Sequence, residues 1–215
     1  MPDGIRVGLE LRDVRIALEG RELVAVDLTI APGEVVTLMG PSGSGKSSLL
    51  GHVCGTLSDA FDVSGQVVLD GVFLDGLPPQ DRHVGILFQD DLLFPHLSVG
   101  GNLAFALPPS IKGRANRRQR VEKALKSAGM DGFADRDPAT LSGGQRARVA
   151  LMRVLLSEPC ALLLDEPFSK LDSGLRDQIR SFVFDLARKN GLPTLMVTHD
   201  PEDGEAAGGR VIKLD

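Results

Sequence analysis

The sequence predicts an α/β fold built around a mainly parallel β-sheet. Short apolar runs such as Val35–Met39 and Ala161–Leu164 are typical of strands that are buried on both faces of a sheet. These runs alternate along the chain with helical patterns, the arrangement that produces parallel strands. The middle third of the 215 residues looks helical, so we expect a helical subdomain inserted into the α/β core.

The composition is that of an ordinary globular domain with one substantial core. Hydrophobic residues make up 42% and charged residues 25% of the chain, and the formal net charge of −5 argues against a general nucleic-acid binder. The sequence has no signal-peptide pattern and no apolar run near the ~20 residues that cross a bilayer. Cys54 and Cys160 form no pair motif, which favours free thiols in a reducing compartment. We therefore expect a cytoplasmic chain.

Strands are predicted first at the N-terminal end. Leu9–Ile16 and Leu23–Ile30 show rough alternation of apolar residues, and Ala31–Glu34 has the composition of a turn. After Val35–Met39, further strands are expected at Gly65–Leu69, Val84–Phe88, Ala161–Leu164 and Thr194–Thr198.

Helices are predicted between these strands. One begins near Ser47, and another covers Ala115–Ala128, where apolar residues recur at three- and four-residue steps. Two more are expected at Gln145–Leu156 and Gln178–Arg188.

A glycine-rich loop follows the strand Val35–Met39. Its pattern, G-x-x-x-x-G-K-S, is that of a Walker A phosphate-binding loop between a strand and a helix. Glycines let several amide groups point at one anion, and the helix dipole adds to the attraction. We expect Lys46 to contact the β- and γ-phosphates of a nucleotide and Ser47 to bind Mg²⁺. The predicted loop residues are Gly40, Pro41, Ser42, Gly43, Ser44, Gly45, Lys46, Ser47 and Ser48.

Two carboxylates end the buried strand Ala161–Leu164. Ligands of open α/β sheets bind at this edge, so Asp165 is predicted to hold Mg²⁺ and Glu166 to act as general base on a water. Gln89 and His199 also follow predicted strands. Taken alone, a Gln or His at a strand end is usually a surface residue. His52, His83 and His96 match no motif, and we expect them to be structural.

The segment Leu141–Gln145 contains two glycines where a helix is predicted to begin. Ser142 and Gln145 fit the S-x-x-Q capping box, so a purely structural capping role is one interpretation. However, glycine costs a helix about 1 kcal/mol relative to alanine. An anion approaching the bare backbone of Gly143 and Gly144 is the other interpretation.

These motifs, in this order, resemble the ATP-binding cassette (ABC) ATPases from about Leu9 to about His199. The resemblance implies a P-loop NTPase (RecA-like) core with a mainly parallel sheet, an N-terminal antiparallel β subdomain and an inserted α-helical subdomain. It implies one ABC ATPase domain over 1–215, with the core at about 1–92 and 160–215 and the helical subdomain at about 93–159. Gln89 corresponds to the Q-loop, which touches Mg²⁺ and the attacking water, and His199 to the switch histidine near the γ-phosphate.

The resemblance also implies that each site is shared between two copies. The γ-phosphate of ATP held by one copy meets Ser142, Gly143, Gly144 and Gln145 of the other, and Asp172 belongs to a D-loop at the same interface. Transmembrane permease subunits are the further partners, and through them the chain would lie on the inner face of the cell membrane. The resemblance implies no direct contact of this chain with cargo or nucleic acid. Phe94, Pro95 and Leu97 are expected either to line the permease groove or to belong to the core.

Import of a small solute is the expected function, because the segment after Gln89 resembles that of bacterial importers. An exporter subunit, a membrane-independent ABC ATPase and a monomeric P-loop kinase are the alternatives. The usual adenine-stacking aromatic is missing from 16–20, so Leu18 is the predicted platform, and no C-terminal regulatory domain is expected. The basic run Arg114–Arg120 is expected to be a solvated helix face, with nucleic acid or lipid contact as the alternative.

Overall fold

The computed structural model describes residues 7–171 and 173–214, and the chain forms two compact units. The first unit comprises the described residues up to Ile86, Cys160–Glu166 and the residues from Phe184 onward. The second comprises Leu87–Pro159 and the described residues of 167–183. Among the helices of the described residues, none combines the length and the apolar composition that crossing a bilayer requires.

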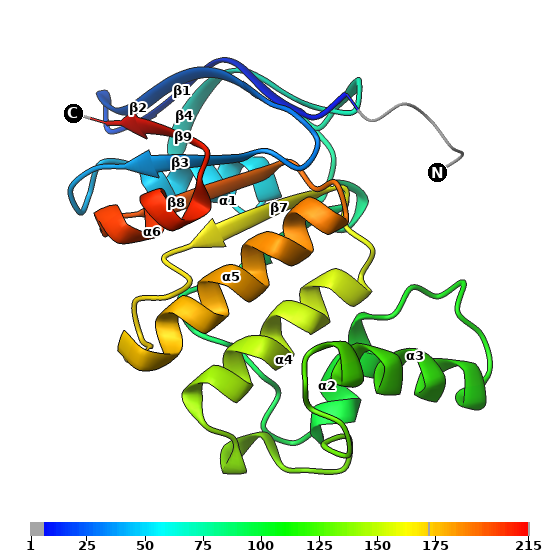
Figure 1. The fold of residues 1–215 in the computed structure, drawn as a ribbon. Coiled ribbons are helices and arrows are strands. Elements are labelled where there is room, and N and C mark those ends of the chain that lie inside the picture. Colours follow the sequence, from blue (N-terminus) through cyan, green and yellow to red (C-terminus); the bar gives the residue numbers. More distant parts are fainter. Residues whose placement is uncertain (1–6, 172, 215) are drawn as a thin grey trace. The chain divides into compact units, whose positions relative to one another are not determined.

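An antiparallel sheet in the first unit has the strand order β2-β1-β4-β5. Figure 1 labels its strands β1, β2 and β4. The central strand β1 pairs through Leu9 with Ile30 of β2 on one side and with Leu69 of β4 on the other. The predicted strand from Gly65 begins four residues earlier, because pairing with β1 extends it to Phe61. The bounds are β1 Leu9–Leu18, β2 Arg21–Ile30, β4 Phe61–Leu69 and β5 Val72–Phe73.

A second sheet has the order β6-β7-β8-β3-β9, and β3 pairs in parallel with both β8 and β9. Its three central strands are buried nearly throughout, as continuous apolar runs predict. The two sheets confirm the predicted α/β class with an N-terminal antiparallel part. The bounds are β3 Val35–Met39, β6 Val84–Leu87, β7 Ala161–Asp165, β8 Thr194–Thr198 and β9 Arg210–Lys213.

Helix α1 (Lys46–Cys54) packs with both sheets in one core. Leu49, Leu50 and Val53 of α1 are at most 1% exposed and cluster with apolar residues of β1, β3 and β8. The first unit also contains the 3-10 turn η1 (Pro79–Asp81) and the short helix α6 (Pro201–Ala207). Burial of α1 between the sheets fixes the position of the loop that precedes it.

The second unit contains helices α2 (Val99–Ala106), α3 (Arg114–Ser127) and α4 (Gly143–Leu156), the 3-10 turn η2 (Pro138–Thr140) and the first part of α5 (Ser173–Lys189). Asn102, which is fully buried in α2, organises the segment before this helix. Its side-chain amide donates to the carbonyls of Phe94, Leu97 and Ser98 and accepts from the amide of Phe94 at 2.7 Å. The helical content of this unit agrees with the prediction for the middle third.

Candidate functional site

The glycine-rich loop connects β3 to α1, as the sequence predicts. Gly43 and Gly45 have φ angles of 85° and 77°, in the left-handed region that favours glycine. Gly45 is the N-cap of α1 and offers no side-chain acceptor. The first amide groups of α1 therefore remain available to an acceptor outside the helix.

Close packing explains two of the glycines. A Cβ at Gly40 would lie 2.9 Å from Ser44 Oγ and 3.0 Å from the carbonyl oxygen of Leu214. A Cβ at Gly45 would lie 3.0 Å from Cβ of Leu23. Larger residues at these two positions would force the loop open.

Lys46 extends back into the loop. Its side chain is 7% exposed, and its ammonium donates to the carbonyls of Gly40 at 2.8 Å and Pro41 at 2.7 Å and to Ser44 Oγ at 3.3 Å. These three contacts hold a full positive charge inside the curve of the loop. An anion that reaches the amide groups of α1 therefore also meets this charge.

The carboxyl ends of three neighbouring strands bring the predicted residues of the first unit together. Met39 at the end of β3 is paired with Thr198 of β8, and Asp165 of β7 is paired with Val197. The phosphate loop, the carboxylate pair and His199 thus leave the sheet at one edge. This edge is where open α/β sheets bind ligands.

Ser47 and Asp165 meet at this edge. The Ser47 hydroxyl donates to Asp165 Oδ1 at 3.3 Å. Burial raises the pKa of Asp165, and the neighbouring Glu166 raises it further, while the Ser47 hydrogen bond and the charge of Lys46 act in the opposite direction. A hydroxyl beside a carboxylate is a donor set that suits Mg²⁺, which binds few protein ligands and completes its shell with phosphate oxygens and water.

Glu166 and His199 form a second polar contact, with Glu166 Oε1 3.1 Å from His199 Nδ1. Glu166 has a φ of 45°, unusual for a residue with a side chain, and its amide donates to the carbonyl of Val197 at 3.0 Å. The Glu166 side chain is 24% exposed and that of His199 is 63% exposed. A carboxylate held beside an imidazole and open to solvent is equipped to orient and deprotonate a water.

The segment Ser142–Gln145 lies in the second unit and forms the start of α4. The Ser142 hydroxyl accepts from the amide of Gln145 at 3.3 Å, and the Gln145 side chain accepts from the amide of Ser142 at 2.9 Å. This reciprocal pair confirms the predicted capping box. The helix also begins two residues earlier than predicted, at Gly143.

The two glycines of this segment have different environments, which corrects the sequence argument. Gly144 is buried, and a Cβ there would lie 2.2 Å from Leu175 Cδ2, so packing against Leu175 explains this glycine. Gly143 is exposed, and among the described residues its Cβ would meet only Arg146 Nη2 at 4.0 Å. Packing therefore accounts for Gly144 but not for Gly143.

Gln89 follows β6 and is exposed in the second unit. It lines a cavity of about 130 Å³ together with Gly143 and Arg146. The structure thus places Gln89 near the start of α4. Asp172, the predicted D-loop aspartate, lies outside the described residues.

The predicted adenine platform has an aromatic neighbour that sequence reasoning missed. Leu18 is half-buried at the end of β1 and pairs across the sheet with Phe61, the first residue of β4. Phe61 lies 43 positions further along the chain, so no local pattern connects it with Leu18. Residues 16–20 contain no aromatic residue, but the neighbouring strand β4 places Phe61 opposite Leu18.

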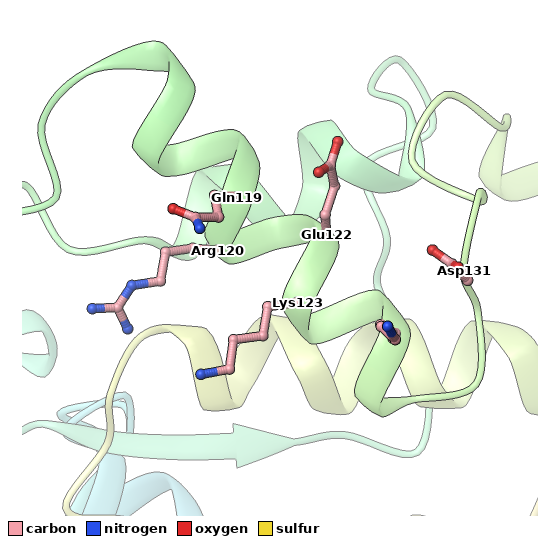
Figure 2. A pocket seen from close by; sticks show the side chains of 6 residues that line it. Gln119, Arg120, Glu122, Lys123 and Asp131 are labelled. Carbon is pink, nitrogen blue, oxygen red and sulfur yellow. The ribbon is translucent and has the colours of Figure 1, made fainter.

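The basic run Arg114–Arg120 is exposed except for Arg117, which is half-buried, as a solvated helix face would be. Arg117 donates to carbonyls of its own unit, and Arg118 pairs with Glu122 at 2.8 Å. Figure 2 shows basic and acidic side chains around the same shallow hollow on α3.

Comparison with known proteins agrees with the motifs. The sequence profile of the family described as ABC transporter matches residues 23–169. The ABC transporter ATP-binding protein YnjD of Escherichia coli (strain K12) is 52% identical over 185 residues, covering 86% of this chain and 85% of that protein. The thiamine import ATP-binding protein ThiQ of Jannaschia sp. (strain CCS1) is 44% identical over 207 residues, covering 96% and 89%.

A solved structure is similar over almost the whole chain. The ATP-binding cassette MJ0796, in a dimeric post-hydrolysis state with ADP and Pi, has a TM-score of 0.79 and 31% identity, covering 96% of this chain and 94% of that one. A family match over most of the chain, close relatives and the site at the edge of the parallel sheet lead to one conclusion. The protein belongs to the ABC transporter family and is an ATP-binding subunit with ATPase activity.

Proposed function

We propose that two copies of this chain enclose two ATP molecules and drive a small-solute importer through permease subunits. The observation that carries this proposal is the common sheet edge, where the phosphate loop, the Ser47–Asp165 contact and the Glu166–His199 contact leave neighbouring strands. These groups supply phosphate binding, metal binding and water activation in one place. The dimeric state of the related MJ0796 cassette supports the pairing of two copies.

Each phosphate-loop residue has a proposed task. Lys46 and the amide groups of the loop from Gly40 to Ser48 bind the β- and γ-phosphates. Mg²⁺, when bound, would neutralise phosphate charge, with Ser47, Asp165 and Gln89 as its protein-side partners. Glu166 accepts a proton from the attacking water, and His199, 3.1 Å from that carboxylate, orients it and contacts the γ-phosphate.

The second copy contributes the start of its α4. The exposed backbone at Gly143, the hydroxyl of Ser142 and the side chain of Gln145 approach the γ-phosphate, and Asp172 belongs to the same interface. Gly143 supports this assignment because, among the described residues, the nearest atom to a Cβ there is Arg146 Nη2 at 4.0 Å, so packing does not account for a glycine. ATP touches both copies, whereas ADP after phosphate release touches mainly one, so hydrolysis lets the copies separate.

The permease is proposed to dock on the second unit, on the inner face of the membrane. Exposed apolar side chains follow β6 and continue on α2: Phe88 is 41%, Leu92 is 55% and Phe105 is 69% exposed. Phe94 packs edge-on against Phe105 with ring centroids 4.8 Å apart. Exposed aromatics of this kind favour a protein interface. The name of the relative ThiQ, a thiamine import ATP-binding protein, supports import over export.

A complementation experiment tests the shared site. Lys46→Ala damages the phosphate loop, and Ser142→Arg damages the start of α4. In a mixed dimer one site carries both changes and the other carries neither. We expect each variant alone to be nearly inactive and the 1:1 mixture to hydrolyse ATP several times faster than the two added together. A mixture that gives only the sum of the separate rates would mean that each copy works alone.

A further inference from the structure

Two acidic residues directly after Gln89 pair with cations from two other segments of the second unit. Asp91 Oδ2 accepts from Arg146 Nε of α4 at 2.9 Å. Asp90 pairs with Lys170, in the segment that precedes α5. The partners lie 55 and 80 positions away along the sequence, and no local pattern predicts either pair.

Arg146 connects this pair to the start of α4. Besides Asp91, its guanidinium donates to the carbonyl of Leu141 at 2.8 Å, and its own amide donates to the carbonyl of Ser142 at 2.9 Å. The same guanidinium is the nearest group to a Cβ built at Gly143. The contact with Asp91 therefore acts on the turn of helix that carries Ser142 and Gly143.

A second arginine fixes the same segment two turns further along α4. Arg153 donates to the carbonyls of Leu92 at 2.8 Å and Asp91 at 3.0 Å. The segment from Asp90 to Leu92 is thus held at two points of one helix.

A cavity separates the segments at this junction. It has a volume of about 130 Å³ and lies among the segment after β6, the start of α4 and the segment 167–171. Close packing of apolar side chains cannot fix the position of segments across an open space. The two ion pairs and the hydrogen bonds of Arg153 to backbone carbonyls join these segments as well.

We infer that Asp90 and Asp91 are positioning residues, which hold Ser142–Gln145 and the segment 167–171 in the arrangement that a partner copy's ATP requires. This inference rests on the proposed two-copy site. The plainer alternative is that both pairs are ordinary surface salt bridges, which contribute little. Asp91 and Arg146 are only 32% and 39% exposed, and Arg146 also bonds the backbone, so Asp91 is the better position for a test.

The test uses the Glu166→Gln chain, in which ATP should remain bound. Asp91→Asn, Arg146→Gln and the double variant are made in that chain, and ATP-dependent dimerisation is measured by light scattering over a range of concentrations. Each dimer contains two such pairs. If the loss of each pair weakens the affinity between the two copies about threefold, the dimer dissociation constant rises about tenfold. The double variant should be no weaker than either single variant, and Asp91→Glu should dimerise nearly as well as the parent.

Two controls distinguish a positioning role from a merely structural one. ATP affinity of the monomer depends on the first unit and should not change in any of these variants. The double variant Arg118→Gln/Glu122→Gln removes an ion pair of α3 at 2.8 Å, similar in length to the Arg146–Asp91 pair at 2.9 Å. This variant should leave dimerisation unchanged. Equal dimerisation of Asp91→Asn and its parent, or additive effects in the double variant, would overturn the inference. If the Glu166→Gln parent itself stays monomeric with ATP and Mg²⁺, the shared site fails and the inference fails with it.

Discussion

The first unit holds its site residues with contacts made inside that unit, whereas the second unit exposes the start of a helix. Lys46, Asp165 and Glu166 each have a polar partner at the edge of the parallel sheet. Ser142 and Gln145 bond each other, and Gly143 beside them is exposed. The cluster of the first unit is organised by its own contacts. The helix start of the second unit leaves the Gly143 backbone exposed, which fits the proposed approach of a partner copy's ATP.

The largest expected effect is on catalysis in the first unit. Glu166→Gln should slow ATP hydrolysis by about 10²–10⁴-fold, because the amide cannot accept the proton of the attacking water. ATP binding should survive, as measured by nucleotide titration beside steady-state turnover.

Glu158→Gln is the matched control for this change. Glu158 also has a left-handed backbone, with φ 54°, but lies in the second unit, after α4. Its substitution should leave turnover unchanged, and normal turnover in Glu166→Gln would remove Glu166 from the proposed role.

The next effect is on nucleotide affinity. Lys46→Ala should weaken ATP binding by roughly 10²-fold or more, since two charge-assisted hydrogen bonds are lost at about 1.5 kcal/mol each. Lys112→Ala, at an exposed lysine of the second unit, should bind ATP normally. Unchanged affinity in Lys46→Ala would contradict the assignment of the loop.

Gly143 and Gly144 of α4 test the exposed helix start of the second unit. Gly144→Ala places a methyl group against Leu175 and should destabilise the fold by about 1–3 kcal/mol. Gly143→Ala meets open space and should stabilise the helix by up to about 1 kcal/mol.

Function should separate from stability at Gly143. Gly143→Ala in the Glu166→Gln chain should weaken ATP-dependent dimerisation although the chain unfolds at a higher denaturant concentration. Dimers as strong as those of the parent would indicate that no ligand approaches this backbone.

The smallest expected effect is on the pH dependence of stability, through His52 near the C-terminal end of α1. Burial lowers the pKa of His52, and the charge of Arg82 acts in the same direction while Asp75 opposes it. Because the unfolded state binds the proton more readily, the contribution of His52 to stability is present above about pH 6.5 and is lost as the pH falls. His52→Gln should therefore reduce the loss of unfolding free energy between pH 7.5 and 5.5, measured by urea denaturation.

Periodicity and motif order predicted the fold class, both sheets' main strands and the capping box. Elements without a strong local pattern were missed. Helix α2 contains Gly100 and Gly101, which are poor helix formers, and a Cβ at Gly100 would lie 2.9 Å from the carbonyl of Ala134. Contacts across the chain, not local propensity, place that helix. The four residues of β9 are defined by pairing with β3.

Site prediction had the same limit. The sequence supplied Lys46, Ser47, Asp165 and Glu166 because each belongs to a short pattern beside a buried strand. It did not supply Arg146 with Asp91, or Phe61 beside Leu18, because those pairs depend on folding. It also treated Gly143 and Gly144 alike, whereas only Gly144 lies against a neighbouring side chain, that of Leu175.

The backbone of Glu166 has a consequence for evolution. A residue with a side chain at φ 45° costs the fold about 1–2 kcal/mol, and a glycine would relieve that strain. Selection for thermal tolerance alone would therefore favour glycine at this position, and with Glu166 as the proposed general base, the more stable protein would hydrolyse ATP more slowly. During laboratory evolution, Glu166 would keep its carboxylate only if the host depended on ATP hydrolysis by this protein.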